Sequence, residues 1–228
     1  MRILTVSDKI EPVLYGPYLR ERVGKIDLVL GCGDLPGYYL EYIVGLLDAP
    51  LFYVHGNHDR PAAANPKLPD GLERCPDMIE WGVNLHGRAV RYQGVLLAGL
   101  EGCRRYNPSA PFQYSERQVG WQVFGLLQRL RWNRLRYGRR LDILITHAPP
   151  HGIHDAKDLP HQGFTSYLKL LRAARPALMI HGHTHVYNRN DVTESDFGAT
   201  RIINTYGYRV LELTPQWETG GWELVRSS

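Results

Sequence analysis

The sequence predicts an α/β fold, and three features of the chain lead to this prediction. Five short runs of mostly apolar residues have the length and composition of strands that are covered on both faces. Helical patterns separate several of these runs, as expected where strands and helices alternate. Each run also leads directly into a cluster of Gly, Asp, Asn or His residues that marks its end.

The elements follow one another along most of the chain. The predicted strands are Arg2–Val6, Ile26–Leu30, Leu51–Val54, Leu141–Thr146 and Ala177–Ile180. The predicted helices are Tyr38–Leu47, Ser115–Tyr137 and Phe164–Ala174. The last helix ends shortly before Pro176, because proline disfavours helical geometry in the residue that precedes it.

Other segments predict strands without helices between them. Two short runs between Val90 and Leu100 flank Gly94 and indicate a hairpin. Three late runs predict an antiparallel meander that closes a second sheet: Ala199–Thr205, Tyr208–Leu213 and Trp222–Val225. Segment Pro61–Asp77 is rich in Pro, Ala and Asp, so we expect a loop or an irregular insertion there.

Length and composition favour one globular domain over residues 1–228, with 43% hydrophobic and 22% charged residues. No apolar run approaches the roughly 20 residues that span a bilayer, so we expect no membrane partner. The N-terminus MRILTVSDKI lacks the pattern of a secretory signal. The three cysteines are widely separated and form no Cys-x-x-Cys pair, which indicates a reducing compartment. We therefore expect a cytoplasmic protein.

The chain is modestly basic, with a formal charge of +4 and an isoelectric point near 9.0. Six arginines fall between Arg129 and Arg140. A solvated helix face that continues into a basic loop explains this stripe, because no RNA- or DNA-binding motif accompanies it. Nucleic acid or another phosphate-rich partner is the alternative.

The polar clusters at the strand ends predict a metal site. Ligands of open α/β sheets bind at the carboxyl ends of the strands. If the five predicted strands share one edge, six side chains meet there: Asp8, Asp34, Asn57, His147, His183 and His185. Oxygen and imidazole ligands suit borderline divalent ions such as Mn, Fe, Co, Ni or Zn better than Ca or a thiolate-bound metal. One carboxylate between two ions bridges them at the ~3.5–4 Å separation of two-metal hydrolases.

These residues occur in motifs that resemble those of the calcineurin-like metallophosphoesterases, and the stretch after His147 is similar to a small prokaryotic subgroup. The matching motifs are Asp8, Gly33-Asp34, Gly56-Asn57-His58-Asp59, His147 and Gly182-His183-Thr184-His185. The resemblance implies a four-layer α/β/β/α sandwich with two mixed β-sheets, and two divalent metal ions. The ligands that it implies are Asp34 as a bridge, Asn57, His147 and His183 for one ion, and Asp8 with His185 for the other.

The first motif departs from the family pattern Asp-x-His, because this chain has Asp8-Lys9-Ile10 and Ile10 cannot bind a metal. Three explanations are open. The ion is lost or held weakly by the other ligands with water, Glu11 turns inward as a ligand, or a remote loop supplies one. We favour Glu11, which stands three residues after Asp8, as a tyrosine ligand does in purple acid phosphatases. A carboxylate favours harder ions, so we expect Mn or Fe, with Zn or Ni as alternatives.

The resemblance also implies roles beside the metal ligands. In the family, the histidine at position 58 contacts the phosphoryl group or protonates the leaving oxygen, so His58 is the expected general acid. Asp59 is expected to orient His58, with a helix-capping role as the alternative. Apart from the resemblance, Arg104 and Arg105 follow a predicted strand and are candidates for clamping a phosphate, with ordinary loop arginines as the alternative. Three histidines of a Pro- and Gly-rich loop are candidates for lining the substrate pocket, with solvent-exposed loop residues as the alternative: His151, His154 and His161.

The function predicted from these residues is hydrolysis of a small phosphoester, with a diester favoured over a monoester by resemblance. Ile10 raises one alternative, a degenerate member that binds metal or nucleotide without turnover. The arginines from Arg129 to Arg140 raise another, a nuclease. Neither the natural substrate nor the oligomeric state follows from the sequence.

Overall fold

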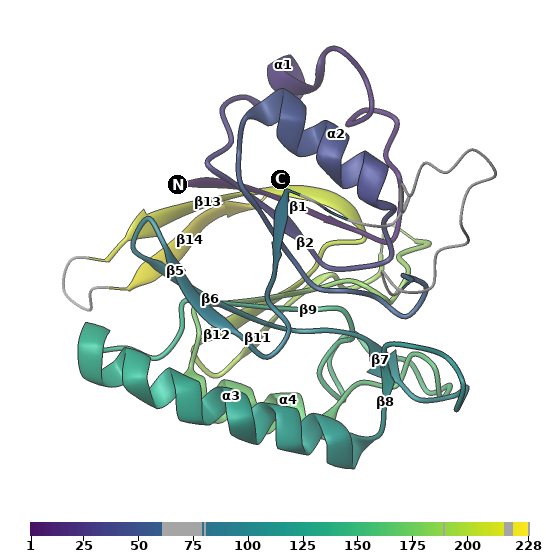
Figure 1. Ribbon diagram of the computed structural model, residues 1–228, viewed down its shortest axis with the longest axis vertical. Helices are drawn as coiled ribbons and strands as arrows, with labels where there is room; N and C mark the ends of the chain where they lie inside the picture. The colour runs from purple at the N-terminus through teal and green to yellow at the C-terminus, as the bar shows by residue number, and fades with distance from the viewer. Residues whose placement is uncertain (61–78, 80, 189, 217–220, 228) are drawn as a thin grey trace, which may run out of the picture.

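Two six-stranded β-sheets face each other in the computed structural model, and helices lie on the outer side of each sheet (Figure 1). The structure describes residues 1–60, 79, 81–188, 190–216 and 221–227. The segment Pro61–Asp77, for which we predicted a loop, therefore lies outside the described residues.

The first sheet has the strand order β14-β13-β1-β2-β3-β4. Its strands are β1 (Arg2–Ser7), β2 (Leu28–Gly31), β3 (Leu51–Tyr53), β4 (Gly82–Asn84), β13 (Gly207–Pro215) and β14 (Trp222–Ser227). The four strands β1 to β4 are parallel, and β13 and β14 add antiparallel pairings at one side. Helices α1 (Leu19–Val23) and α2 (Gly37–Leu47) cover its outer face (Figure 1).

The second sheet has the strand order β11-β12-β10-β9-β6-β5. Its strands are β5 (Ala89–Tyr92), β6 (Val95–Leu100), β9 (Ile143–Thr146), β10 (Leu178–His181), β11 (Glu194–Phe197) and β12 (Thr200–Asn204). The four central strands are parallel, and both edge strands are antiparallel to their neighbours. Helices α3 (Glu116–Tyr137) and α4 (Thr165–Ala174) cover its outer face, and β7 (Cys103–Arg104) pairs with β8 (Gln113–Tyr114) at one end.

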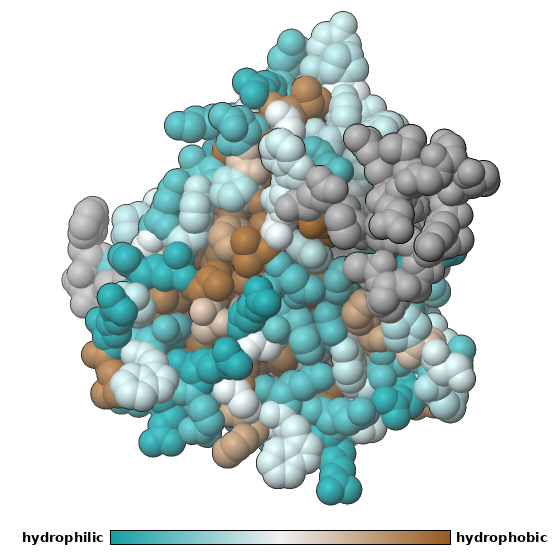
Figure 2. Space-filling view, in the orientation of Figure 1, coloured by the Kyte–Doolittle hydropathy of each residue, from teal (hydrophilic) through white to brown (hydrophobic). Residues whose placement is uncertain are grey.

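Three apolar clusters hold these layers together. One joins α1 and α2 to the first sheet, a second joins α3 and α4 to the other sheet, and the third fills the space between the sheets. The third cluster contains Ile3 and Leu30 from one sheet and Ile145 and Ile180 from the other, all fully buried. Figure 2 shows hydrophobic residues at the centre of the same view, with mostly hydrophilic residues around them. The predicted four-layer α/β/β/α sandwich with two mixed sheets is therefore confirmed.

The predicted hairpin between Val90 and Leu100 is confirmed as well. β5 and β6 pair directly, and Gln93 and Gly94 form the turn between them. Both turn residues have positive φ angles, 44° for Gln93 and 89° for Gly94. This conformation matches the right-handed twist of the two strands, and glycine adopts it at little cost.

The predicted late meander is wrong for its first run, which belongs to the other sheet, whereas its last two runs pair antiparallel as β13 and β14, as expected. β12 pairs in parallel with β10, whereas β13 pairs antiparallel with β1 in the other sheet. The chain crosses between the sheets at Thr205, whose N–H donates to the His181 carbonyl at 2.8 Å. The Thr205 hydroxyl lies 2.5 Å from the Thr5 hydroxyl on β1, which ties the crossing to the first sheet. Our sequence reasoning also missed α1 and the short or polar strands β4, β7, β8 and β11.

In the part of the chain that the structure describes, no helix combines the length and the apolar composition needed to cross a membrane.

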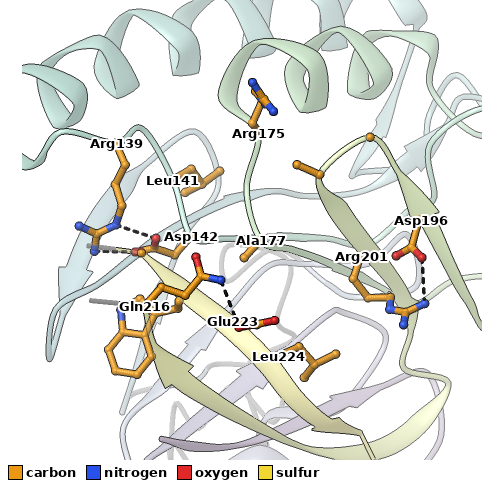
Figure 3. Close-up of a pocket in the computed structure, with 14 residues that line it drawn as sticks. Arg139, Leu141, Asp142, Arg175, Ala177, Asp196, Arg201, Gln216, Glu223 and Leu224 are labelled. Atoms are coloured by element: carbon orange, nitrogen blue, oxygen red, sulfur yellow. Dashed lines mark hydrogen bonds and ion pairs between the residues drawn. The ribbon is translucent and has the colours of Figure 1, made fainter. Parts of the chain in front are cut away.

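A buried carboxylate anchors the start of β9. Asp142 is 2% exposed, and its carboxylate accepts two hydrogen bonds from the Arg139 guanidinium, at 2.7 and 2.9 Å. It also accepts a hydrogen bond from the Leu96 N–H at 2.8 Å, and so ties β9 to β6. Figure 3 draws the paired Arg139 and Asp142.

We predict that Asp142→Ala lowers the free energy of unfolding by about 3 kcal/mol, because it leaves a guanidinium and a buried N–H without their partner. The measurement is urea unfolding followed by circular dichroism. Asp196→Ala is the matched control, since it breaks the exposed pair with Arg201 and is expected to cost less than about 1 kcal/mol. Equal losses in the two variants would contradict this account of Asp142.

Candidate metal centre

The carboxyl ends of five parallel strands meet at one edge of the sandwich, and the predicted ligands follow them directly. Three of these residues adopt left-handed backbone conformations, with φ of 62° at Asp8, 56° at Asp34 and 66° at His183. Such a conformation costs a residue with a side chain roughly 1–3 kcal/mol and persists where the surrounding structure enforces it. The chain therefore holds strained turns at three of the positions that carry candidate ligands.

Three side chains form the centre of the site. Asp34, His147 and His183 each offer one ligand atom, and these atoms all lie within 4.8 Å of one another. His147 Nε2 lies 3.4 Å from Asp34 Oδ2 and 3.0 Å from Asn57 Oδ1. Asp34 follows β2 in one sheet and His147 follows β9 in the other, so the site joins the two sheets.

Neighbouring groups fix which atoms face the centre. His147 Nδ1 donates to the Cys32 carbonyl at 2.8 Å, so Nε2 points toward Asp34 and Asn57. His183 Nε2 donates to the Pro160 carbonyl at 2.8 Å, which leaves Nδ1 as its ligand atom. Backbone carbonyls commonly orient metal-binding histidines in this way.

The Asn57 amide is oriented by a hydrogen bond to another side chain. Its Nδ2 donates to the Tyr106 hydroxyl at 3.3 Å, which leaves Oδ1 directed at His147. Tyr106 lies in the loop after β7, and our sequence reasoning did not single it out. No motif marks this tyrosine, because its contact joins residues 49 positions apart.

Burial and neighbouring charges oppose each other in setting the pKa values here. Burial raises the pKa of the Asp34 carboxyl, but the adjacent His147 imidazole outweighs it and brings this pKa to about 2. Burial lowers the pKa of His147, but the Asp34 carboxylate outweighs it and brings this pKa to about 9. Burial lowers the pKa of His183 to about 3 and raises the pKa of Asp8. Asp34 and His147 thus form a buried ion pair near neutral pH.

Asp8 lies behind this centre. Its two carboxylate oxygens accept hydrogen bonds from the His183 N–H, at 3.0 and 2.9 Å. A Cβ atom at Gly182 would lie 2.3 Å from the Asp8 carboxylate, and a Cβ atom at Gly56 would lie 2.0 Å from the Asp34 carboxylate. Glycine is therefore required at both positions for the carboxylates to approach the backbone this closely.

His185 lies at the mouth of the site and is exposed. Its Nδ1 lies 2.9 Å from the Tyr187 hydroxyl, and its ring packs on Tyr206 with centroids 4.8 Å apart. It lines a cavity of about 260 Å³ together with Asp34 and His183 of the centre. The residues around this cavity are Asp34, Asn57, His58, Tyr106, Pro160, His161, His183 and His185.

Position 10 is occupied by a partly exposed isoleucine, 39% exposed. The Glu11 carboxylate lies 2.7 Å from Lys9 Nζ and packs near Gly207. The Glu11 N–H donates to the Tyr39 hydroxyl. Glu11 is not among the described residues that line the cavity. Its carboxylate is paired with Lys9 instead.

His58 and Asp59 have separate surroundings. The exposed His58 side chain lines the cavity, and the backbone N–H of His58 donates to Asp34 Oδ1 at 2.8 Å. Asp59 Oδ2 accepts from the N–H groups of Gly56 and Asp34, at 2.7 and 3.2 Å, and lies 3.6 Å from His55 Nδ1. Asp59 therefore holds the loop backbone that presents Asp34 and Asn57.

The expected substrate residues are engaged elsewhere. Arg104 binds Glu116 and Gln162, each at 3.1 Å, and Arg105 donates twice to the Gln113 carbonyl. His151 is paired with Asp155 at 3.1 Å. None of the three is among the described residues that line the cavity.

The two other histidines between β9 and α4, His154 and His161, have different surroundings. The His161 ring lies against the His183 ring, with centroids 5.0 Å apart, and lines the metal cavity. His154 lies outside this cavity and connects buried His181 to Ser195, at 3.0 and 2.8 Å. The structure thus brings His161, but not His154, to the candidate metal centre.

A cavity of about 550 Å³ lies at the opposite edge of the second sheet, near the start of β9 and β10 (Figure 3). Most of its polar side chains pair with one another, as the dashed lines in Figure 3 show for Arg139 with Asp142, Arg201 with Asp196, and Gln216 with Glu223, whereas Arg175 is drawn without such a line. Because most of its polar groups are paired in this way, we place the functional site at the carboxyl edge.

Comparison with known proteins identifies the family of the chain. The family model for calcineurin-like phosphoesterases matches residues 6–187, which include every predicted ligand. No curated protein matches the chain. The crystal structure of TT1561 from Thermus thermophilus has 16% identity and a TM-score of 0.59, over 98% of this chain and 97% of that one. A hypothetical protein from the same organism has 16% identity and a TM-score of 0.52, over 100% and 97%. The two structures share the fold, and the matched motifs identify the chain as a member of the calcineurin-like phosphoesterase family.

Proposed function

We propose that this protein is a metal-dependent phosphodiesterase that hydrolyses a small phosphoester. The observation that carries the proposal is the buried cluster of Asp34, Asn57, His147 and His183, in which every candidate ligand atom is oriented by a neighbouring group. Buried charged groups need partners, and a cation at this point would satisfy the lone pairs that meet there. Free, buried Cys32 and Cys103 support a reducing compartment, for which we propose the cytoplasm.

The donor set fits one ion closely and a second ion less fully. Asp34, Asn57, His147 and His183 would hold the first ion. Asp8 and His185, with Asp34 between the two positions, would hold the second. Divalent ions bound there would lower the pKa of a water molecule and neutralise phosphoryl oxygens. Mixed carboxylate, amide and imidazole ligands suit Mn, Fe, Ni or Zn, and the added carboxylate of Glu11 would favour Mn or Fe among them.

The remaining side chains would act directly on the substrate. His58 lies in the wall of the cavity without belonging to the ligand set, so its imidazole can protonate the departing oxygen. His161 and Tyr106 line the same cavity and are candidates for contacts with the phosphoryl oxygens. Asp59 keeps the loop in place through its bonds to Gly56 and Asp34.

The test of the proposal is a metal and substrate screen on the purified chain. We expect bound transition metal by elemental analysis, and hydrolysis of bis-p-nitrophenyl phosphate with added Mn²⁺ that exceeds hydrolysis of p-nitrophenyl phosphate. Asn57→Ala is expected to lose metal and activity together. Bound metal without hydrolysis of either compound would instead support a binding protein without turnover. Degradation of single-stranded nucleic acid as the main activity would support a nuclease.

We predict that His58→Ala lowers the rate of diester hydrolysis by about 10²–10⁴-fold, because the variant loses its general acid. Its metal content should stay that of the native chain, which separates this role from metal binding. His151→Ala is the control, since it removes an imidazole paired with Asp155 outside the cavity. A fully active His58→Ala enzyme would remove this residue from the mechanism.

Glu11 is the proposed ligand that needs the most rearrangement, because its carboxylate must leave Lys9. If Glu11 binds the second ion, Glu11→Ala should lower the metal content from two ions toward one, and reduce activity at limiting Mn²⁺. Lys9→Ala should keep both ions, because it frees the carboxylate. Unchanged metal content and activity in Glu11→Ala would show that water or another group completes this position.

The raised pKa of His147 predicts pH-dependent metal affinity. At pH values below about 9, the metal-free imidazole carries a proton that an ion at Nε2 must displace. Apparent Mn²⁺ affinity should therefore rise with pH between 7 and 9, by up to about tenfold per unit for one proton released. Calorimetric titration in buffers of different ionisation enthalpy counts the released protons. His58→Ala should retain this dependence, and a flat affinity over that range would exclude His147 as the ligand.

A further inference from the structure

Helix α3 has two apolar faces, of which only one is packed. Its inner face is buried through Val119, Val123, Leu126 and Leu130. Its outer face carries four large apolar side chains that are mostly exposed. They are Trp121 at 64%, Phe124 at 55%, Trp132 at 74% and Leu135 at 79%. Exposure of one such residue is ordinary, but four on one helix mark an interaction surface.

The four residues form a stripe along the helix in two groups, Trp121 with Phe124 and Trp132 with Leu135, and the exposed Gln128 lies between the groups on the same side. At 3.6 residues per turn, the spacing from Trp121 to Phe124, Trp132 and Leu135 brings them to the side opposite the buried face. The Trp121 and Phe124 rings already meet edge to face, with centroids 6.1 Å apart. In Figure 1, α3 runs along the lower edge of the molecule, and no described element lies outside it. Figure 2 shows pale and brown residues among hydrophilic ones along this edge.

Positive charge borders the stripe on both sides. Arg129 and Arg136 fall on one side of it and Arg131 and Arg134 on the other, and all four are exposed. Glu116 is the only acidic residue in the helix, and its carboxylate is engaged by Arg104 and Ser166. The outer face of α3 is therefore apolar at its centre, cationic at its margins and without a free acidic group of its own.

We propose that this face of α3 docks on the surface of an anionic lipid bilayer. The aromatic rings and Leu135 would enter the boundary between headgroups and acyl chains, while the arginines bind lipid phosphates. The stripe from Trp121 to Leu135 is about 21 Å long at the rise of an α-helix, and a single convex helix fits a plane better than a groove. The helix would lie on the membrane without crossing it, which is compatible with the lack of a membrane-spanning helix among the described residues.

A bilayer accounts for this surface better than the other partners do. In a second copy of the chain, the same arginines would face one another without acidic partners, and like charges repel. Single-stranded nucleic acid would use the arginines and aromatic rings, but it offers nothing to bury Leu135, the most exposed of the four. Lipid headgroups and acyl chains together match both the charge and the apolar stripe.

The proposed docking of α3 does not rest on the proposed reaction. Hydrogen bonds nevertheless link the start of α3 to the metal cavity. Glu116 at the start of α3 binds Arg104, and Arg104 also binds Gln162 in the loop that carries His161 to the metal cavity. The membrane-bound helix would therefore hold the catalytic loops near the lipid surface.

The experiment is co-sedimentation of the full chain with sucrose-loaded vesicles. We expect binding to vesicles of phosphatidylcholine with phosphatidylglycerol, and at least tenfold weaker binding to phosphatidylcholine alone. The double variant Trp121→Ser/Trp132→Ser should lower the partition coefficient by tenfold or more. Replacement of any one of the four arginines beside the stripe by glutamine should lower the partition coefficient by on the order of fivefold. Trp81→Ser is the control, because Trp81 is 75% exposed outside α3 and its loss should leave binding unchanged.

Circular dichroism and diester hydrolysis serve as controls for folding, since the substituted side chains lie on the outer face of α3 and outside the metal cavity. Equal binding of native chain and double variant to anionic vesicles, or no binding by either, overturns the proposal. Two further outcomes also overturn it. One is a native dimer that the double variant converts to a monomer, and the other is binding to single-stranded DNA with no binding to vesicles.

Discussion

The contact between Asp34 and His147 links the two halves of this molecule. Asp34 ends a strand of one sheet, His147 ends a strand of the other, and both side chains are almost fully enclosed. A carboxylate and an imidazolium in such surroundings stabilise each other, but either one alone would carry a large desolvation penalty. The carboxyl edges of both sheets are thus required to meet at one point. The close approach of the backbone to the Asp34 carboxylate at Gly56 and the left-handed turn at Asp34 occur at this contact.

Much of this arrangement could be predicted from the sequence, because it depends on local patterns. Apolar runs of four to six residues defined the central strands. The polar residues that follow these runs lie at the carboxyl ends of the strands, where ligands of such sheets bind. The crossing at Thr205 could not be predicted in this way. Nothing in the residues near it distinguishes a turn back along the same sheet from a step to the other sheet. That choice depends on contacts with His181 and Thr5, which are remote in the chain.

The same limit applies to side chains around the site. Arg104, Arg105 and Asp59 have suitable chemistry for binding a phosphate or orienting an imidazole, and their sequence positions support such roles. In the folded chain they bind Glu116, the Gln113 carbonyl and the backbone of the loop after β3 instead. Tyr106 shows the converse, because it orients Asn57 without belonging to any motif. In α3, the buried and exposed apolar residues are interleaved with arginines, so sequence periodicity alone indicated one ordinary solvated face.

We expect the two proposed positions to bind their ions with different affinities, and Ile10 contributes to this difference. Three ligands of the first position, Asn57, His147 and His183, are buried and have their orientations fixed by Tyr106, Cys32 and Pro160. The second position relies on the exposed His185 and on Asp8, which already accepts two hydrogen bonds from one backbone N–H. Since an exposed ligand is less enclosed by the protein and Asp8 already accepts backbone hydrogen bonds, the second ion should be held more weakly than the first. Loss of a histidine at position 10 deepens this difference, so occupancy of the second position would depend on the free metal concentration around the protein.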